Sequence, residues 1–173
     1  ISQHFGDGHE FGVDIRYLEE EHPLGTAGAL SRLKDSDGPL LVMNGDILTQ
    51  VNYEAMLDFH REHGADLTMA VRKHEISVPY GVIETDGVKV TGILEKPVTR
   101  HLINAGIYLM EPEVCRFVPT DYPYDMPDLI SLLLAQGRQV VSFPVREYWL
   151  DIGQHADYRQ AQTDVVTEGF INP

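Results

Sequence analysis

The sequence contains a single cysteine, Cys115, so an intrachain disulfide is excluded. A lone thiol suits a reducing compartment, and we expect a cytoplasmic location. Long hydrophobic runs are also missing: none approaches the roughly 20 residues of a membrane-spanning helix. The first residues, ISQHFGDGHEFG, are polar and glycine-rich, which is not the pattern of a signal peptide. We therefore expect no membrane partner.

Basic residues are scarce, with 13 Lys and Arg against 27 Asp and Glu, for a formal net charge of −14. This balance argues against a nucleic-acid partner or an anionic membrane surface. A phosphorylated small molecule stays compatible with it, provided that a few cations or metal ions are placed locally. With 173 residues, 43% of them hydrophobic, the chain can bury a core, and we expect one domain over residues 1–173.

Strand and helix signals alternate along the chain. Hydrophobic patterning predicts strands at 13–18, 40–44, 67–71, 102–110 and 140–145, and helices at 26–34, after Asn52, after Asp125 and at 158–166. The uninterrupted apolar run at 40–44 is typical of a strand buried on both faces. Asp86-Gly87 predicts a two-residue hairpin turn. The expected fold is α/β, with a mostly parallel sheet, helices on both faces and an antiparallel hairpin excursion.

Two carboxylates follow apolar segments that read as strands. Asp46 ends Asn44-Gly45-Asp46, and Asp151 lies in YWLDIG. Ligands of open α/β sheets bind beyond the carboxyl ends of strands, and two such acids suit Mg²⁺ together with phosphate oxygens and water. The alternatives are a turn for Asp46 and a helix N-cap for Asp151.

The segment LGTAGAL (24–30) has two glycines before an expected helix, so a flat or anionic ligand could approach its backbone closely. A tight turn that starts the helix is the alternative. The segment is not a Walker loop, because Gly-Lys-Ser/Thr is missing.

Two further motifs follow the hairpin. In Glu95-Lys96-Pro97, we expect Pro97 to hold Lys96 in an extended conformation that aims its ammonium group at a phosphate. An exposed charge pair is the alternative. Asn104-Ala105-Gly106 offers an amide beside a small residue, or else a β-bulge.

The sequence lacks the residue patterns that zinc binding and nucleophilic catalysis require. His60 and His63 lie one helical turn apart, but no cysteine or third histidine supports zinc there. A nucleophile elbow is also missing.

The order of the motifs LGTAGAL, NGD, YGV, EKP, NAGIY and WLDIG resembles the nucleotidyltransferase family of sugar-nucleotide pyrophosphorylases. The resemblance runs from about Phe5 to Ala161. It implies a Rossmann-like, glycosyltransferase-A-like fold, and nucleotidyl transfer from a nucleoside triphosphate to a sugar 1-phosphate with release of pyrophosphate. Such a phosphoanhydride exchange needs in-line positioning and charge neutralisation rather than a protein nucleophile.

The resemblance also implies roles for individual residues. Asp46 and Asp151 would bind Mg²⁺ beside the α-phosphate, and Lys96 would bind the sugar phosphate. The implied nucleotide contacts are Leu24, Gly25, Thr26, Gly28, Asn44 and Gly45, and the implied sugar contacts are Gly81, Glu95, Asn104 and Gly106.

The family's opening element, a Gly-rich loop ending in Arg and followed by a Lys-Pro segment, has no match in residues 1–30. We therefore expect a domain without its N-terminal triphosphate-binding segment, and we expect the 173-residue chain not to turn over alone.

Within the family, LGTAGAL resembles guanylyltransferases acting on mannose 1-phosphate or related hexose phosphates. The pattern YDMPDLI with WLDIGQHADYRQA resembles members that carry paired CBS domains upstream. A homo-oligomer is a separate expectation. Two alternatives stay open: the same fold using UTP or CTP with another sugar phosphate, and a non-catalytic or regulatory module that binds sugar nucleotides.

Overall fold

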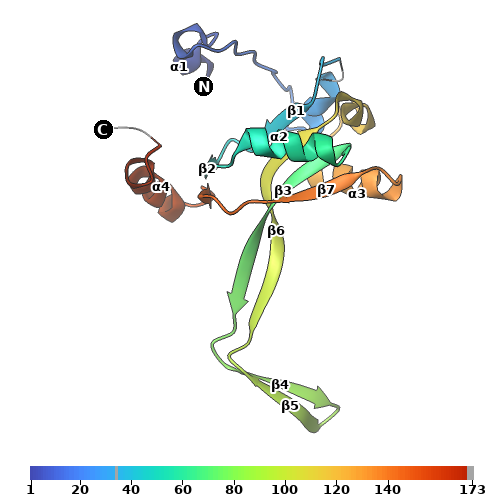
Figure 1. Cartoon of the computed structure of the whole chain (residues 1–173), viewed down its shortest axis with the longest axis vertical. Coiled ribbons are helices and arrows are strands. Elements are labelled where there is room, and N and C mark those ends of the chain that lie inside the picture. Colours follow the sequence, from blue (N-terminus) through green and yellow to red (C-terminus); the bar gives the residue numbers. More distant parts are fainter. Residues whose placement is uncertain (34, 171–173) are drawn as a thin grey trace. The chain divides into compact units, whose positions relative to one another are not determined.

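A four-stranded mixed sheet in the order β1-β6-β3-β7 organises the larger part of the chain (Figure 1). The computed structural model describes residues 1–33 and 35–170. Clustering of contacts along the chain separates a helical unit, Ile1–Gly38 with Glu111–Arg138, from a sheet unit, Pro39–Met110 with Gln139–Pro173. Among the described residues, no helix combines the length and the apolar character that crossing a bilayer requires.

Three strands of the sheet run in one direction and the fourth runs against them. The strands are β1 (Leu40–Met43), β3 (Leu67–Ser77), β6 (Val98–Met110) and β7 (Val140–Pro144). β6 is antiparallel to both β1 and β3, whereas β7 is parallel to β3. The carboxyl ends of β1 and β7, and the middle of β3, therefore lie along the same edge. This is the edge at which α/β sheets bind ligands.

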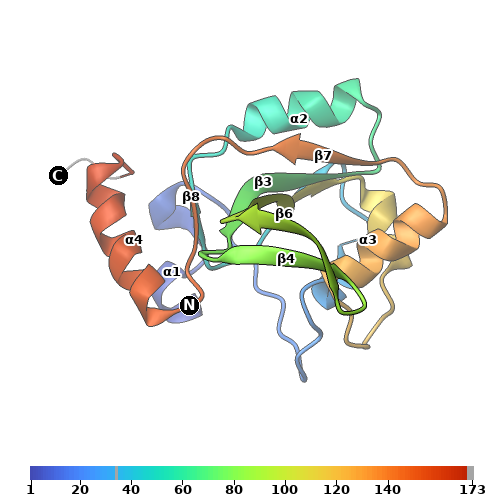
Figure 2. The same ribbon diagram turned by 90° about the horizontal axis from the view of Figure 1, so that it is seen from below.

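The helix α2 (Tyr53–Glu62) covers one face of this sheet (Figure 2). Its start is capped as the sequence predicts, because Asn52 Oδ1 accepts from the N–H of Ala55 at 2.9 Å. Met56 is fully buried and belongs to a core cluster with Ala70 and Ile107. The predicted helix after Asn52 is confirmed, and the hydrophobic burial of its inner face is what fixes it on the sheet.

β3 and β6 continue past the sheet as a two-stranded ribbon that ends in a hairpin of β4 (Gly81–Asp86) and β5 (Lys89–Glu95) (Figure 1). Asp86 pairs with Lys89, so Gly87 and Val88 form the two-residue loop, with φ of Gly87 at +59°. The predicted hairpin is present, but its turn is one residue later than the predicted Asp86-Gly87, because Asp86 still belongs to β4 and pairs with Lys89. The strands at 67–71 and 102–110 are predicted too short, because the ribbon sequence is polar and lacks an apolar alternation.

β1 differs from its predicted environment. Leu41 and Met43 are 47% and 44% exposed, so the strand is not buried on both faces. β1 is an edge strand of the sheet, and these two side chains point to its exposed face. An uninterrupted apolar run does not reveal which strand will stand at an edge.

The helical unit contains α1 (Ser2–Phe5), η1 (His9–Phe11), η2 (Gly28–Arg32), η3 (Pro112–Phe117) and α3 (Met126–Ala135). The predicted strand at 13–18 is wrong, because these residues run as irregular chain. The Tyr17 hydroxyl donates to Gly6 O at 2.7 Å and the Ile15 N–H to Asp7 O at 2.8 Å. The segment bonds to a nearby turn rather than to a strand.

The helix predicted at 26–34 is the shorter 3₁₀-helix η2, and residue 34 lies outside the described residues. Asp125 stands at the N-cap position of α3, as predicted, but its carboxylate makes no capping bond to the helix. Instead the Oγ1 of Thr26 accepts from the N–H of Met126 at 2.9 Å, and Asp125 accepts from Thr26. The cap is supplied by another segment.

The last elements are β8 (Trp149–Asp151) and α4 (His155–Thr167), which includes the predicted helix at 158–166. The Tyr148 hydroxyl donates to Asp164 Oδ2 at 2.5 Å and ties α4 to the segment before β8. Burial of the hydroxyl and this bond to a carboxylate raise the pKa of Tyr148 to about 12.

Candidate active site

The structure brings Asp46 and Asp151 together through a small two-stranded sheet. β2 (Ile47–Thr49) pairs with β8, and Ile47 stands opposite Asp151. One step further, the N–H of Ile152 donates to the main-chain oxygen of Asp46 at 2.9 Å. The two acids are far apart in the sequence, so this contact depends on the tertiary fold.

Both carboxylates are exposed, and neither hydrogen-bonds to another side chain or N–H group within residues 1–33 and 35–170. The N-cap interpretation of Asp151 is wrong, because α4 is capped by Gln154 in a capping box with Asp157. Asp46 lies in a turn, but its carboxylate is not used to close that turn. Two carboxylates without protein partners are the donor set that a hard divalent cation accepts, with phosphate oxygens and water completing its shell.

A close contact between two motifs holds Asn44 next to β6. The N–H of Asn44 donates to Gly106 O at 2.9 Å. Gly106 has φ +70°, and a Cβ placed on it would lie 2.8 Å from Asn44 Nδ2. Only glycine fits there without displacing Asn44. The glycine of one motif thus positions the asparagine that leads into Asp46.

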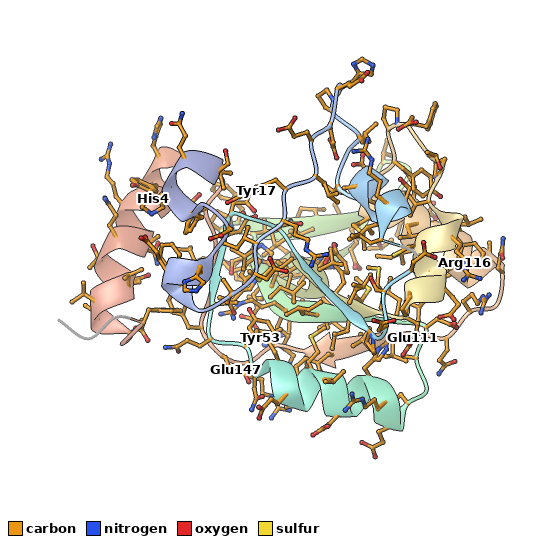
Figure 3. The ribbon with its side chains drawn as sticks, turned by 90° about the horizontal axis from the view of Figure 1, so that it is seen from above. His4, Tyr17, Tyr53, Glu111, Arg116 and Glu147 are labelled. Carbon is orange, nitrogen blue, oxygen red and sulfur yellow. The ribbon has the colours of Figure 1, made fainter. Side chains whose placement is uncertain are left out.

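Two aromatic side chains support the same edge. The Trp149 indole N–H donates to Ala105 O at 2.8 Å and packs against the sheet core. Tyr53, labelled at the start of α2 in Figure 3, donates to Met43 Sδ at 3.4 Å, and burial raises its pKa. Trp149 opens the motif WLDIG, but the motif does not reveal this supporting role, and Tyr53 lies in none of the motifs. The presence of only one tryptophan, adjacent to Leu150-Asp151, was the available signal for Trp149.

Gly81 and Glu95 face each other at the base of the hairpin. They are paired across β4 and β5, and a Cβ on Gly81 would lie 3.1 Å from Glu95 Oε2. Lys96 follows directly and is exposed. The predicted extended conformation of Lys96 is wrong: its φ is +45°. The turn from β5 to β6 imposes this left-handed backbone, which is uncommon for a residue with a side chain.

Asn104 lies at a β-bulge, where the pairing of β3 with β6 shifts between Met69 and Val71. Asn104 Oδ1 accepts from the N–H of Gly106 at 3.0 Å, and its amide donates to the Tyr108 hydroxyl at 2.5 Å. Burial raises the pKa of Tyr108, and this hydrogen bond opposes the shift. The predicted bulge is present, and one amide hydrogen of Asn104 stays available to a ligand.

The segment 24–30 belongs to the helical unit. Thr26 N–H and Oγ1 donate to Asp125 Oδ1 at 2.9 and 3.2 Å. A Cβ on Gly25 would lie 2.6 Å from that oxygen, and one on Gly28 would lie 2.4 Å from the Leu24 Cβ. The tight-turn alternative therefore accounts for both glycines. Gly25 and Thr26 are exposed, whereas Leu24 and Gly28 are buried.

Two histidines, one in the last turn of α2 and one at its C-cap, bond within the protein. His60 Nδ1 and Thr68 Oγ1 are 2.8 Å apart in the core, and His63 Nδ1 lies 2.8 Å from Phe59 O. Among the described residues, no cluster of three or more His, Cys, Asp or Glu has a geometry that would hold a metal ion. A metal at Asp46 and Asp151 would thus have no third His, Cys, Asp or Glu ligand among the described residues.

Comparison with known proteins identifies the family. The family model described as "Nucleotidyl transferase" matches residues 1–168. The chain belongs to this family. Mannose-1-phosphate guanyltransferase of Candida albicans is 35% identical over 158 residues, which are 86% of this chain and 43% of that protein. Mannose-1-phosphate guanylyltransferase of Mycobacterium tuberculosis is 34% identical over 170 residues, 94% of this chain and 47% of that protein.

The chain thus spans less than half the length of these nucleotidyl transferases. Solved structures confirm the mixed α/β fold. HddC from Yersinia pseudotuberculosis has a TM-score of 0.68 at 22% identity, covering 95% of this chain and 72% of that one. A Bacillus anthracis protein assigned to glucose-1-phosphate thymidylyltransferases has a TM-score of 0.70 at 22% identity, covering 99% and 72%. Nucleotidyl transferases of this family typically use a divalent metal ion.

Proposed function

We propose that this protein transfers a nucleotidyl group, GMP from GTP, to a sugar 1-phosphate and releases pyrophosphate. The observation that carries the proposal is the pairing of β2 with β8, which sets Asp151 opposite Ile47, the residue after Asp46, while the N–H of Ile152 donates to the main-chain oxygen of Asp46. The relatives named as mannose-1-phosphate guanyltransferases support GTP as donor and a mannose-type phosphate as acceptor.

Asp46 and Asp151 would hold the divalent cation, which we propose is Mg²⁺. When bound, Mg²⁺ supplies positive charge to the phosphate oxygens. The residues of the chain would bind and orient the other parts of the nucleoside triphosphate and the sugar 1-phosphate. The attacking oxygen of a sugar phosphate is already anionic at neutral pH, so no protein base is needed. A new bond forms between this oxygen and the α-phosphorus while the bond to pyrophosphate breaks.

For the acceptor we propose that Lys96 binds the phosphate and Glu95 binds sugar hydroxyls. Asn104 would donate its free amide hydrogen to another hydroxyl, and the main chain at Gly81 and Gly106 would contact the sugar. Two observations support this proposal. Gly81 is paired with Glu95 across β4 and β5, and Asn104 is held at the bulge by its hydrogen bond from the N–H of Gly106.

For the nucleotide we propose contacts from two segments, each with a main chain that a ligand could approach. The proposed contact residues are Leu24, Gly25, Thr26, Gly28, Asn44 and Gly45. Gly25 and Thr26 are the exposed members of the first segment, and they support a role in contacting the base.

A pyrophosphate-release assay of the full-length protein tests the function, with GTP, UTP, CTP, ATP and dTTP each combined with mannose 1-phosphate and glucose 1-phosphate. We expect the highest rate with GTP and mannose 1-phosphate in Mg²⁺. A higher rate with UTP or CTP would support the alternative donors. No release with any pair would support the non-catalytic module.

The metal assignment is tested in the same assay with Asp46→Asn and Asp151→Asn, which we expect to lower turnover by roughly 100-fold or more, since each removes one anionic ligand. Asp58→Asn, on the exposed side of α2, is the matched control and should keep wild-type turnover. If either site variant turned over at the wild-type rate, the metal assignment would be wrong.

The 173-residue chain can be tested by binding even without turnover. Calorimetric titration with Mg²⁺ should give heat that Asp46→Asn abolishes, and GDP-mannose should raise the melting temperature in the presence of Mg²⁺. These measurements separate a chain that binds but does not react from one that does neither.

Location and partners are proposals as well. We propose a cytoplasmic protein, in keeping with the buried, unpaired thiol of Cys115. We also propose a homo-oligomer and CBS domains in the same polypeptide. Light scattering of the purified protein measures the first, and sequencing of the whole gene settles the second.

A further inference from the structure

Trp149 connects the two proposed ligand sites of the sheet unit. It begins β8, the three-residue strand that ends at Asp151. Its indole N–H donates to Ala105 O at 2.8 Å, and Ala105 lies between Asn104 and Gly106 on β6. One side chain therefore links the strand of a proposed metal ligand to the bulge of a proposed sugar contact.

The peptide group between Ala105 and Gly106 extends this link. Its oxygen accepts from the Trp149 indole, and its N–H, that of Gly106, donates to Asn104 Oδ1 at 3.0 Å. The amide of Asn104 in turn donates to the Tyr108 hydroxyl. Hydrogen bonds that share a peptide group polarise and strengthen one another. The orientation of the Asn104 amide is thus coupled to the position of Trp149.

Arg72 holds the same ring from another strand. β7 ends at Pro144 opposite Val71 of β3, and Arg72 is the next residue of β3. Its Nη1 donates to the main-chain oxygen of Glu147 at 2.9 Å, and its guanidinium carbon lies 5.8 Å from the centre of the Trp149 ring. Arg72 therefore contacts both the chain that leads into β8 and the first side chain of β8.

An arginine suits this position better than a lysine. A guanidinium is flat and carries donors along its edge, so it can face an aromatic ring and donate to a carbonyl at the same time. Within residues 1–33 and 35–170, Arg72 forms no ion pair with a carboxylate. Glu147, labelled in Figure 3, turns its own carboxylate to the N–H of Arg146, with Oε2 accepting at 2.9 Å. The guanidinium thus holds the chain before β8 rather than balancing a negative charge.

The opposite edge of β8 is bonded to β2. Thr49 Oγ1 and the N–H of Gln50 donate to Tyr148 O at 2.8 and 3.0 Å. These bonds hold the small sheet of β2 and β8 together. The contacts of Trp149 and Arg72 join that small sheet to β6 and β3 of the main sheet. Loss of either contact would let the small sheet shift relative to the bulge on β6.

We propose that Arg72 and Trp149 are positioning residues of the nucleotidyl transfer, which keep Asp151 at a fixed distance from Asn104. The inference rests on the proposed function, in which Asp151 holds the divalent cation and Asn104 binds an acceptor hydroxyl. A fixed spacing between them sets the acceptor phosphate against the α-phosphorus. Neither Arg72 nor Trp149 has to touch a substrate for this role.

The first measurement needs no substrate and uses the 173-residue chain, in which Trp149 is the only tryptophan. NMR follows its single indole N–H signal together with the side-chain amide of Asn104. Trp149→Phe keeps a ring but removes the donor, and we expect it to shift the Asn104 amide signals. Arg72→Met removes the guanidinium but keeps an unbranched chain, and exchange of the indole hydrogen with solvent should become about tenfold faster.

Arg100→Met is the matched control for Arg72→Met. Arg100 is an exposed arginine of β6 that pairs with Glu75 at 2.7 Å. Its replacement should leave the indole exchange and the Asn104 signals unchanged. The proposal would be overturned by wild-type indole exchange in Arg72→Met, or by Asn104 signals that Trp149→Phe does not move.

The second measurement is pyrophosphate release by the full-length protein with GTP and mannose 1-phosphate at increasing Mg²⁺. Groups that orient a metal ligand typically change metal affinity or activity by about 10–100-fold when they are replaced. We therefore expect Arg72→Met and Trp149→Phe to raise the Mg²⁺ concentration of half-maximal rate by about tenfold. Arg72→Lys, which keeps the charge without the fork, should raise it as well. A variant that is only less folded would lose rate at every Mg²⁺ concentration without moving this midpoint.

The two measurements separate this inference from the proposed function. If the wild-type full-length protein released no pyrophosphate, the transferase would be refuted, and the NMR spectra would still decide whether Arg72 and Trp149 hold β8 and Asn104 together. If the wild type turned over and neither Arg72→Met nor Trp149→Phe moved the Mg²⁺ midpoint, the positioning role would be refuted and the transferase would stand.

Discussion

Lys96 has a φ of +45°, so this residue combines a proposed ligand contact with a strained backbone. For a residue with a Cβ, the left-handed region costs roughly 1–2 kcal/mol. Such strain persists only where the surroundings fix the chain, and it is common at ligand sites. Here the pairing of Gly81 with Glu95 on one side and the start of β6 on the other hold the turn.

This strain predicts that the glycine and alanine variants rank in opposite orders of stability at Lys96 and at Lys89. Lys96→Gly should be more stable to urea than Lys96→Ala by about 0.5–1 kcal/mol, because glycine relieves the left-handed penalty although it adds entropy to the unfolded chain. At Lys89, which has an ordinary strand backbone, the glycine variant should instead be the less stable. The same order at both positions would argue against strain at Lys96.

Gly106 gives a second prediction at this scale. Gly106→Ala should lower the free energy of unfolding by about 1–3 kcal/mol, because the new methyl would meet Asn44 Nδ2 and the φ of +70° disfavours a side chain. Adding Asn44→Ala should recover part of the loss, measured as a coupling in a double-mutant cycle. Additive effects would show that the two residues do not press on each other.

At the scale of elements, helix starts depend on single hydrogen bonds that the sequence reveals well. Asn52→Ala should cost about 1 kcal/mol in chemical denaturation, because the N–H of Ala55 loses its acceptor at the start of α2. Asn52→Asp should keep the stability, since aspartate also caps and its charge favours the helix N-terminus. A loss of equal size for both variants would contradict the cap.

The attachment of α4 predicts a pH dependence. The pKa of Tyr148 is about 12 in the folded protein, above the usual value near 10, so the folded state keeps its proton more firmly than the unfolded chain. The resulting stabilisation is complete below pH 10 and is lost as pH rises from 10 to 12.

Hydrogen exchange of the α4 amides measures this loss. Protection of α4 should fall between pH 10 and 12 in the wild type, after correction for the intrinsic rate, and Tyr148→Phe should remove that step. Tyr80→Phe, at a side chain that is 74% exposed, is the matched control and should keep it. A step that survives Tyr148→Phe would assign the titration to another group.

The strengths and failures of sequence-based prediction follow from these elements. α2 is predicted because its cap, its apolar stripe and Gly64 all lie within one short segment. The strand predicted at 13–18 is wrong because alternation of side chains does not show whether a neighbouring strand is available for pairing. The extended conformation predicted for Lys96 from Pro97 is wrong, because the turn into β6 imposes a left-handed backbone there. Asp46 and Asp151 are predicted as ligands by motif, while the contact between their strands needs the fold.

For the molecule as a whole, the dominant feature is the net charge of −14. Self-repulsion among exposed acids destabilises a folded chain, and salt screens it over about 10 Å at 0.1 M. The melting temperature should therefore rise as NaCl increases from about 20 to 200 mM at neutral pH. MgCl₂ at equal ionic strength should raise it further if Asp46 and Asp151 bind the cation, and Asp46→Asn should remove only that extra rise. A melting temperature that falls with NaCl would show that attractive pairs dominate.

The pairing of β2 with β8 has a consequence for how the molecule is made. Synthesis proceeds from the N-terminus, so β2 with Asp46 leaves the ribosome before β8 with Asp151, and the elements from α2 to β7 are made between them. A nascent chain therefore carries only half of the proposed metal pair until β8 has been made. A product that stops before β8 lacks that pair.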